Sequence, residues 1–238
     1  MKKNNTEKTN KLIAKALSFK QNGDLINAEI ILKDVLKLDS DNFIALNNIG
    51  NIYSAQNELK KAKNFFSKAI NIKHNYSNAI FNLALVNEEM GNKEEAIKFY
   101  KDAIKYDQDN LGIYYNLSRI DDGFFLDNNI KKIKEILKKK NTSNFSKSSG
   151  FFILATNERK KKNLEEEFKY LIEAHKYFHF SNEMINNQVS FYWIRLLPKI
   201  IKRFSFQEEK NTSQIIKPIF ITGLPRSGST LIESILCS

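Results

Sequence analysis

The chain has 238 residues, 42% of them hydrophobic, which is enough for a packed core in one large domain or two modest ones. Its net charge of +11 comes from lysines spread along the whole sequence, which favours solvated lysine surfaces over a nucleic-acid interface. The single cysteine, Cys237, excludes an intrachain disulfide, and together with the three histidines it forms no metal-binding pattern.

The N-terminal residues 1–8 are polar and lack the apolar segment of a secretory signal. No stretch of the sequence has the length and apolar character of a membrane span. We therefore expect a polar N-terminal tail over residues 1–8, a cytoplasmic location, and no membrane, nucleic-acid or metal partner.

Residues 9–110 repeat with a period of 34 residues. Small residues recur at two fixed positions, where two helices approach closely, and a large residue recurs between them. The period predicts an α-solenoid of helix pairs over residues 9–42, 43–76 and 77–110, with a partial fourth pair up to residue 120. The recurring sets are Ala28, Ala62 and Ala96; Ala16, Gly50 and Ala84; and Leu32, Phe66 and Tyr100.

Turns within these pairs are predicted at Gly23, Asn57 and Gly91, because glycine and asparagine accept the left-handed backbone that ends a helix. The whole pattern resembles the tetratricopeptide repeat family, although the proline that usually ends each repeat is missing. The resemblance implies a groove that binds a protein or peptide partner.

Asn48, Asn82 and Asn116 share one repeat position on the first helix of each pair. In this family that position often faces the groove, where a carboxamide can hydrogen-bond a peptide backbone. The alternative is that these asparagines belong to the common repeat pattern of an asparagine-rich chain. Repeats that hold chaperone carboxylates use lysines nearby, and Ile13 and Leu17 stand at two such places, which argues against that partner.

Beyond residue 120 the repeat pattern decays, and residues 121–206 are expected to form a diverged helical region. Within it we expect an amphipathic helix over 129–140, a polar linker over 141–150 and a diverged final repeat over 148–181. A long aromatic-bearing helix is expected over 182–204, followed by a connector over 207–216.

Residues 217–238 have the pattern of a strand, a glycine-bearing loop and a helix. Such a loop directs backbone N–H groups at an anion beside a helix N-terminus. Gly223 and Gly228 have the spacing of a Walker loop, but Ser229 stands where that loop needs lysine, which argues against ATP or GTP hydrolysis. Arg226 supplies the cation instead.

This loop resembles the 5′-phosphosulfate-binding loop of the sulfotransferase superfamily. The resemblance implies 3′-phosphoadenosine 5′-phosphosulfate as cofactor and sulfuryl transfer to a hydroxyl or amine. By the same resemblance Arg226 contacts the phosphosulfate and its neighbours cradle it. The alternative is a turn whose glycines serve only the backbone. The implied cofactor-binding residues are Pro225, Arg226, Ser227, Gly228, Ser229 and Thr230.

The fold class predicted from the sequence is therefore mostly α: a solenoid of helix pairs, followed over 217–238 by the first strand, phosphate loop and helix of an α/β sulfotransferase domain. The superfamily's general base and its 3′-phosphate and adenine contacts follow this helix, so no catalytic residue is predicted. We expect the N-terminal part of a repeat–sulfotransferase fusion, inactive by itself. The alternative is a non-enzymatic adaptor whose repeats bind other proteins.

Overall fold

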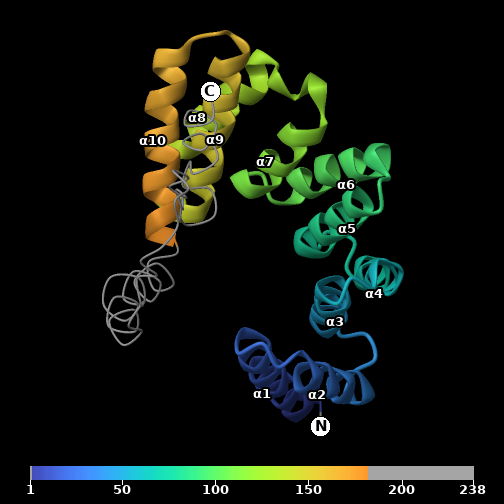
Figure 1. Cartoon of the computed structure of the whole chain (residues 1–238). Helices are drawn as coiled ribbons and strands as arrows, with labels where there is room; N and C mark the ends of the chain where they lie inside the picture. The colour runs from blue at the N-terminus through green and yellow to red at the C-terminus, as the bar shows by residue number, and fades with distance from the viewer. Residues whose placement is uncertain (1, 182–238) are drawn as a thin grey trace, which may run out of the picture. The chain divides into compact units, whose positions relative to one another are not determined.

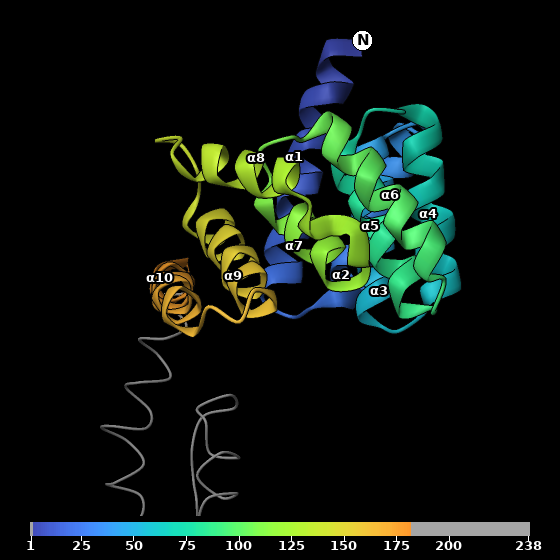
Figure 2. The same cartoon turned by 90° about the horizontal axis from the view of Figure 1, so that it is seen from above.

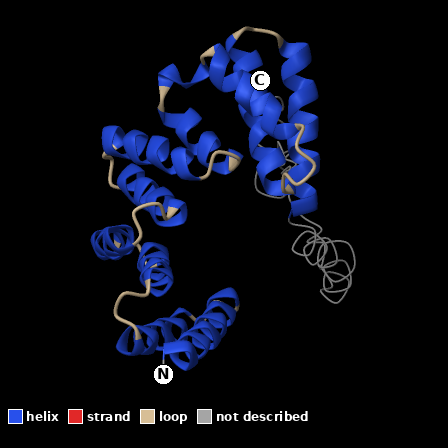
Figure 3. Ribbon diagram, turned by 180° about the vertical axis from the view of Figure 1, so that it is seen from behind, coloured by secondary structure: helices blue, strands red, loops and turns tan. Residues whose placement is uncertain are grey.

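Helix pairs follow one another along the chain (Figure 1). The computed structural model describes residues 2–181, and within them it contains helices and no strand (Figure 3). The predicted helix over 182–204, the connector over 207–216 and the strand, loop and helix over 217–238 lie outside the described residues. The described elements are α1 (Lys2–Gln21), α2 (Leu25–Leu38), α3 (Phe43–Ala55), α4 (Leu59–Ile72), α5 (Ser77–Glu89), α6 (Lys93–Tyr106), α7 (Leu111–Ile120), the 3-10 helix η1 (Asp122–Phe125), α8 (Asp127–Leu137), α9 (Asn144–Lys160) and α10 (Leu164–Ser181).

The predicted solenoid of helix pairs is confirmed for α1/α2, α3/α4 and α5/α6, each of which packs on the next pair. Helix α1 begins at Lys2 and so includes residues 2–8 of the polar tail predicted over residues 1–8. Lysine and glutamate have good helix propensity. An ion pair one turn apart, between Glu7 and Lys11 at 2.8 Å, adds to the stability of this polar first half of α1.

The three predicted turn residues all adopt the left-handed backbone, with φ of 82° at Gly23, 60° at Asn57 and 80° at Gly91. Between pairs, where the family's proline is missing, polar side chains start the next helix instead. Asn42 accepts a hydrogen bond from the Ala45 amide at 3.0 Å, which satisfies a backbone donor at the start of α3.

The core of the pairs follows the 34-residue period. Ala28, Ala62 and Ala96 are fully buried, and the large residues between the small ones are at most 1% exposed. Gly50 allows the closest approach, because a Cβ atom there would lie 2.5 Å from Cε1 of Phe66. The small residue and the aromatic ring are therefore matched in size.

Polar contacts between neighbouring pairs also recur at equivalent positions. The Tyr53 hydroxyl donates to Glu29 at 2.7 Å, and one repeat later Lys63 donates to Asn87 at 2.8 Å. Hydrogen bonds from Lys33 and Tyr53 lower the pKa of the Glu29 carboxyl. Each contact joins a second helix to the first helix of the next pair.

The repeat pattern is interrupted after α7. Asp121 accepts a hydrogen bond from the Gly123 amide at 3.1 Å and pairs with Lys101 at 2.8 Å, and the Lys101 contact lowers the pKa of the Asp121 carboxyl. The short η1 and the amphipathic α8 follow, and α8 buries Ile133 and Ile136. The chain thus inserts extra elements before the next long helix.

The linker predicted over residues 141–150 is wrong, because α9 begins at Asn144 with Ser143 as its N-cap. Its serines and glycine suggested a loop, but here their small size lets the helix pack closely. A Cβ atom on Gly150 would lie 2.6 Å from Cδ1 of Leu111, and the Ser148 hydroxyl donates to the Ala174 carbonyl at 2.9 Å. These contacts place α9 against α7, α8 and α10.

The final helices α9 and α10 pack side by side as a further pair (Figure 1). The turn between them contains Lys162 with φ of 60°, the same left-handed backbone as in the earlier turns. Phe151 stacks on Tyr177 with ring centroids 5.6 Å apart. Lysine gives no sequence signal for such a turn, which is why this one was not predicted.

Candidate functional site: an uncharged face with a terminal pocket

From the second pair onward, charge is divided unequally between the first and second helices, whereas the first helix α1 carries six lysines. Helix α3 contains no charged residue, α5 carries charge only at Glu88 and Glu89 near its end, and α7 carries only Arg119. Helices α4 and α6 are rich in lysine. In Figure 1, α1, α3, α5 and α7 line one side of the pairs and α2, α4 and α6 the other. Figure 2 shows α4 and α6 on the side away from α9 and α10.

The side with few charges is formed by residues that are adjacent or one turn apart on α3, α5 and α7, and we call it the first-helix face. It carries carboxamides interrupted by aromatic rings, of which Asn47 and Asn48 are buried and the others are partly or fully exposed. The lysines near these helices belong mostly to α4 and α6, so α3, α5 and α7 contribute little positive charge to this face. Its residues are Asn47, Asn48, Asn51, Asn78, Phe81, Asn82, Tyr115 and Asn116.

The three asparagines predicted to bind peptide are spaced along this face rather than gathered at one point. Asn48 and Asn116 each donate to a carbonyl one turn earlier in their own helix, at 2.9 Å in both cases. Asn82 donates to Oδ1 of Asn47 at 2.9 Å and so joins α5 to α3. That they contact a peptide stays a prediction. Asn47 was not predicted, although it precedes Asn48 in the repeat.

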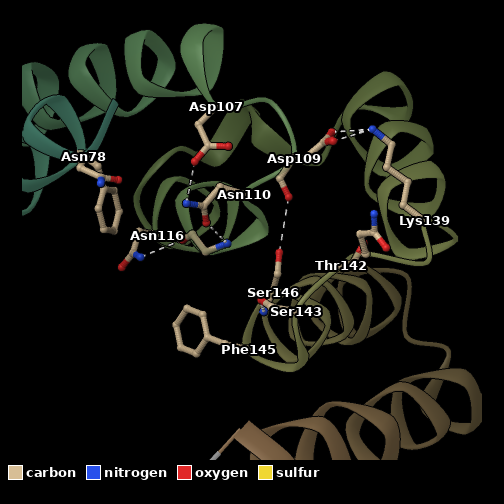
Figure 4. Close-up of a pocket in the computed structure, with 13 residues that line it drawn as sticks. Asn78, Asp107, Asp109, Asn110, Asn116, Lys139, Thr142, Ser143, Phe145 and Ser146 are labelled. Carbon is tan, nitrogen blue, oxygen red and sulfur yellow. Dashed lines mark hydrogen bonds and ion pairs between the residues drawn. The ribbon is translucent and has the colours of Figure 1, made fainter. Parts of the chain in front are cut away.

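A cavity of about 520 Å³ opens at the end of the first-helix face, between α5, α7 and the segment that joins α8 to α9 (Figure 4). Asn78 and Asn116 lie on one side of it in the figure, and Lys139 and Thr142 lie on the other. Its lining comes from α5 (Asn78, Phe81), the α6–α7 loop and α7 (Asp107, Asp109, Asn110, Gly112, Asn116), and the α8–α9 loop and α9 (Lys139, Asn141, Thr142, Ser143, Phe145, Ser146).

Hydrogen bonds hold the two sides of this pocket together. Lys139 donates to both carboxylate oxygens of Asp109, at 2.7 Å each. The Ser146 hydroxyl accepts from the Leu111 amide at 3.1 Å and donates to the Asp109 carbonyl at 3.4 Å. The start of α9 is therefore fixed to the start of α7, which a linker over 141–150 could not achieve.

The remaining sequence predictions concern residues that the structure does not bring into this site. The predicted phosphosulfate loop, Pro225 to Thr230, lies outside the described residues.

Within residues 2–181 no helix is both long enough and apolar enough to cross a bilayer. The same residues contain no cluster of three or more His, Cys, Asp or Glu side chains suited to a metal ion.

Comparison with known proteins bears on the paired helices. The family model described as tetratricopeptide repeat matches residues 44–76 and 77–110. Residues 44–110 are tetratricopeptide repeats. These matches coincide with the second and third predicted helix pairs, so the first-helix face is the first-helix side of the tetratricopeptide repeats and of α7 that follows them.

Solved structures share the fold of these tetratricopeptide repeats. The crystal structure of MamA has a TM-score of 0.52 and 21% identity, over 71% of this chain and 96% of MamA. A Podosopora anserina protein of nearly identical TPR-like repeats has a TM-score of 0.53 and 13% identity, over 73% and 96% of the two chains. Identities this low support the fold alone. The search of curated proteins found no significant match.

Proposed function

We propose that this chain is a protein-interaction module whose tetratricopeptide repeats bind an extended partner peptide on the first-helix face. The observation that carries the proposal is the uncharged, carboxamide-rich character of this face in a chain of net charge +11. A carboxamide both donates and accepts hydrogen bonds, as a peptide backbone requires. The arrangement fits a partner that is held mainly by its backbone.

The lack of positive charge on the first-helix face argues against an acidic partner peptide. Lys60 and Lys68 belong to α4, a second helix, and α3 offers no cation to a carboxylate. Electrostatic attraction between exposed charges is screened by salt, whereas hydrogen bonds between neutral groups change little. We therefore infer a polar partner sequence that is not acidic.

The first test selects peptides of about 12 residues from a displayed random library with the full chain, then measures their affinity. Replacing Asn82 with alanine is expected to weaken the selected peptides about 10-fold, which corresponds to roughly one hydrogen bond left unmade. The matched control is Asn64→Ala, because Asn64 is exposed on the second helix α4. The affinity is expected to change less than about 5-fold between roughly 50 and 500 mM salt, because at most one partly exposed charge contact contributes.

Two results would contradict this proposal. Equal binding by wild type and Asn82→Ala would remove the first-helix face as the site. Selection of acidic peptides whose affinity falls steeply with salt would place the partner on the lysine-bearing helices instead.

A second candidate function, sulfotransferase activity, is supported by one observation in the sequence. The segment from Pro225 to Thr230 has the order of residues typical of a phosphosulfate loop, with Arg226 as its cation. The resemblance supports 3′-phosphoadenosine 5′-phosphosulfate as the cofactor. This candidate rests on the sequence motif, and the repeats would then recruit a protein or peptide to the enzyme.

Calorimetry with adenosine 3′,5′-bisphosphate tests this candidate. We expect weak binding, with no submicromolar affinity, that Arg226→Ala reduces about 10-fold because a charge-assisted contact is lost. Arg203→Ala is the matched control outside the motif. Binding that is equal in wild type and Arg226→Ala would argue against a phosphosulfate loop.

A further inference from the structure

The pocket at the end of the first-helix face contains one carboxylate whose charge is not balanced. Of its two acidic side chains, Asp109 is paired with Lys139 through both oxygens. Asp107 accepts a hydrogen bond from the neutral Asn110 at 3.0 Å and forms no ion pair within residues 2–181. Since Lys139 is the pocket's only cation among the lining residues described, the pocket has a net negative charge.

Aromatic rings and exposed carboxamides line the same pocket as this carboxylate. Phe145 is 57% exposed, and Phe81 is half-buried on the α5 side. Asn78 and Asn141 are exposed, and their side chains form no hydrogen bond within the described part of the chain. Phenyl faces attract cations, and amide oxygens accept from N–H donors.

From this combination we propose that the pocket binds the guanidinium group of an arginine in the partner peptide. The inference rests on the proposed peptide-binding function and names one side chain that the partner carries. Arginine presents a planar cation with several donors, which matches a carboxylate, amide oxygens and flat apolar walls. A volume of about 520 Å³ leaves room for this side chain and the adjoining backbone.

An anionic group does not fit the same pocket. Lys139 is already held by Asp109, so an incoming carboxylate or phosphate would compete with that pair and face Asp107. Lys132 of α8 donates to the side chain of Gln108 at 3.5 Å and does not line the pocket, and the lysines of α4 and α6 belong to the second helices. The negative charge of the pocket therefore acts locally within a positively charged chain.

The test titrates the ¹⁵N-labelled full chain with N-acetyl-arginine-N-methylamide and follows the side-chain amide signals of Asn78 and Asn141 by NMR. The comparison probe is N-acetyl-citrulline-N-methylamide, which has the same length and planarity but no charge. We expect the arginine probe to bind about 5-fold more tightly than citrulline, as one partly exposed charge contact allows. In Asp107→Asn, which keeps an acceptor for Asn110, the difference is expected to fall below about 2-fold.

The matched control is Asp34→Asn on α2, where Asp34 pairs with Lys37, and it should leave the preference unchanged. Equal affinity of the two probes, a stronger response to N-acetyl-glutamate, or no shift of the pocket signals would overturn the proposal. Asn82→Ala should not alter the arginine titration. The arginine titration therefore tests the pocket separately from peptide binding along the first-helix face.

Discussion

Replacing Gly150 with valine should destabilise the chain by about 3 kcal/mol, at the upper end of the cost of overpacking a core. A Cβ atom at this position would lie 2.6 Å from Cδ1 of Leu111 and 2.9 Å from Cδ2 of Leu137. Leu111 is fully buried, so its side chain has little room to move. For a domain of this size, we expect the midpoint of thermal unfolding to fall by roughly 6–12 °C.

The control for this substitution is Gly123→Ala, because a Cβ atom there would meet only Oδ1 of Asp121, at the ordinary distance of 3.5 Å. Gly150→Ala should lie between the two, since its clash is partly offset by alanine's better helix propensity. A valine variant as stable as wild type would mean that α9 does not pack on α7 and α8 in solution.

Replacing Phe66 with alanine should cost about 3–5 kcal/mol, the usual loss when a buried aromatic ring leaves a cavity. Phe66 is 1% exposed and lies against Gly50, which has no side chain to fill the space. Because each pair is stabilised by its neighbours, we expect the loss to weaken the solenoid beyond α3 and α4. Chemical denaturation followed by circular dichroism measures it.

The matched phenylalanine control is Phe168→Ala on α10, where the side chain is 66% exposed. Its cost is expected to stay within about 0.5 kcal/mol, as for other surface positions. If both variants lost similar stability, the small-residue and aromatic pairing at Gly50 and Phe66 would not be the core contact that the structure indicates.

The parts of the fold that repeat were predictable from the sequence, and the parts that break the repeat were not. A small residue recurs every 34 residues at the position of Ala62, and a large one at the position of Phe66. The burial of both therefore follows from the period. The start of α9 has no periodic signal, and a serine such as Ser146 can stand in a loop or in a close helix contact. The Ser146 hydroxyl donates to the carbonyl of Asp109, 37 residues earlier in the chain, so its role depends on a residue distant in sequence.

The candidate site was likewise predictable from the sequence only in part. Asn48, Asn82 and Asn116 were found by their spacing, and all three lie on the first-helix face. The proposed role of Asp107 could not be predicted in this way. It depends on the absence of a cation beside Asp107 once Lys139 pairs with Asp109. Sequence spacing predicts position on a helix, but it does not predict which charges remain unbalanced.

The first-helix face ends at the segment that joins α8 to α9. A regular array offers the same surface in every repeat, so an extended ligand could lie on it in several frames, each one repeat apart. Lys139 and Thr142 lie across the pocket from Asn78 and Asn116 (Figure 4). For the peptide proposed to bind this face, the interruption would determine which repeat each part of the peptide contacts.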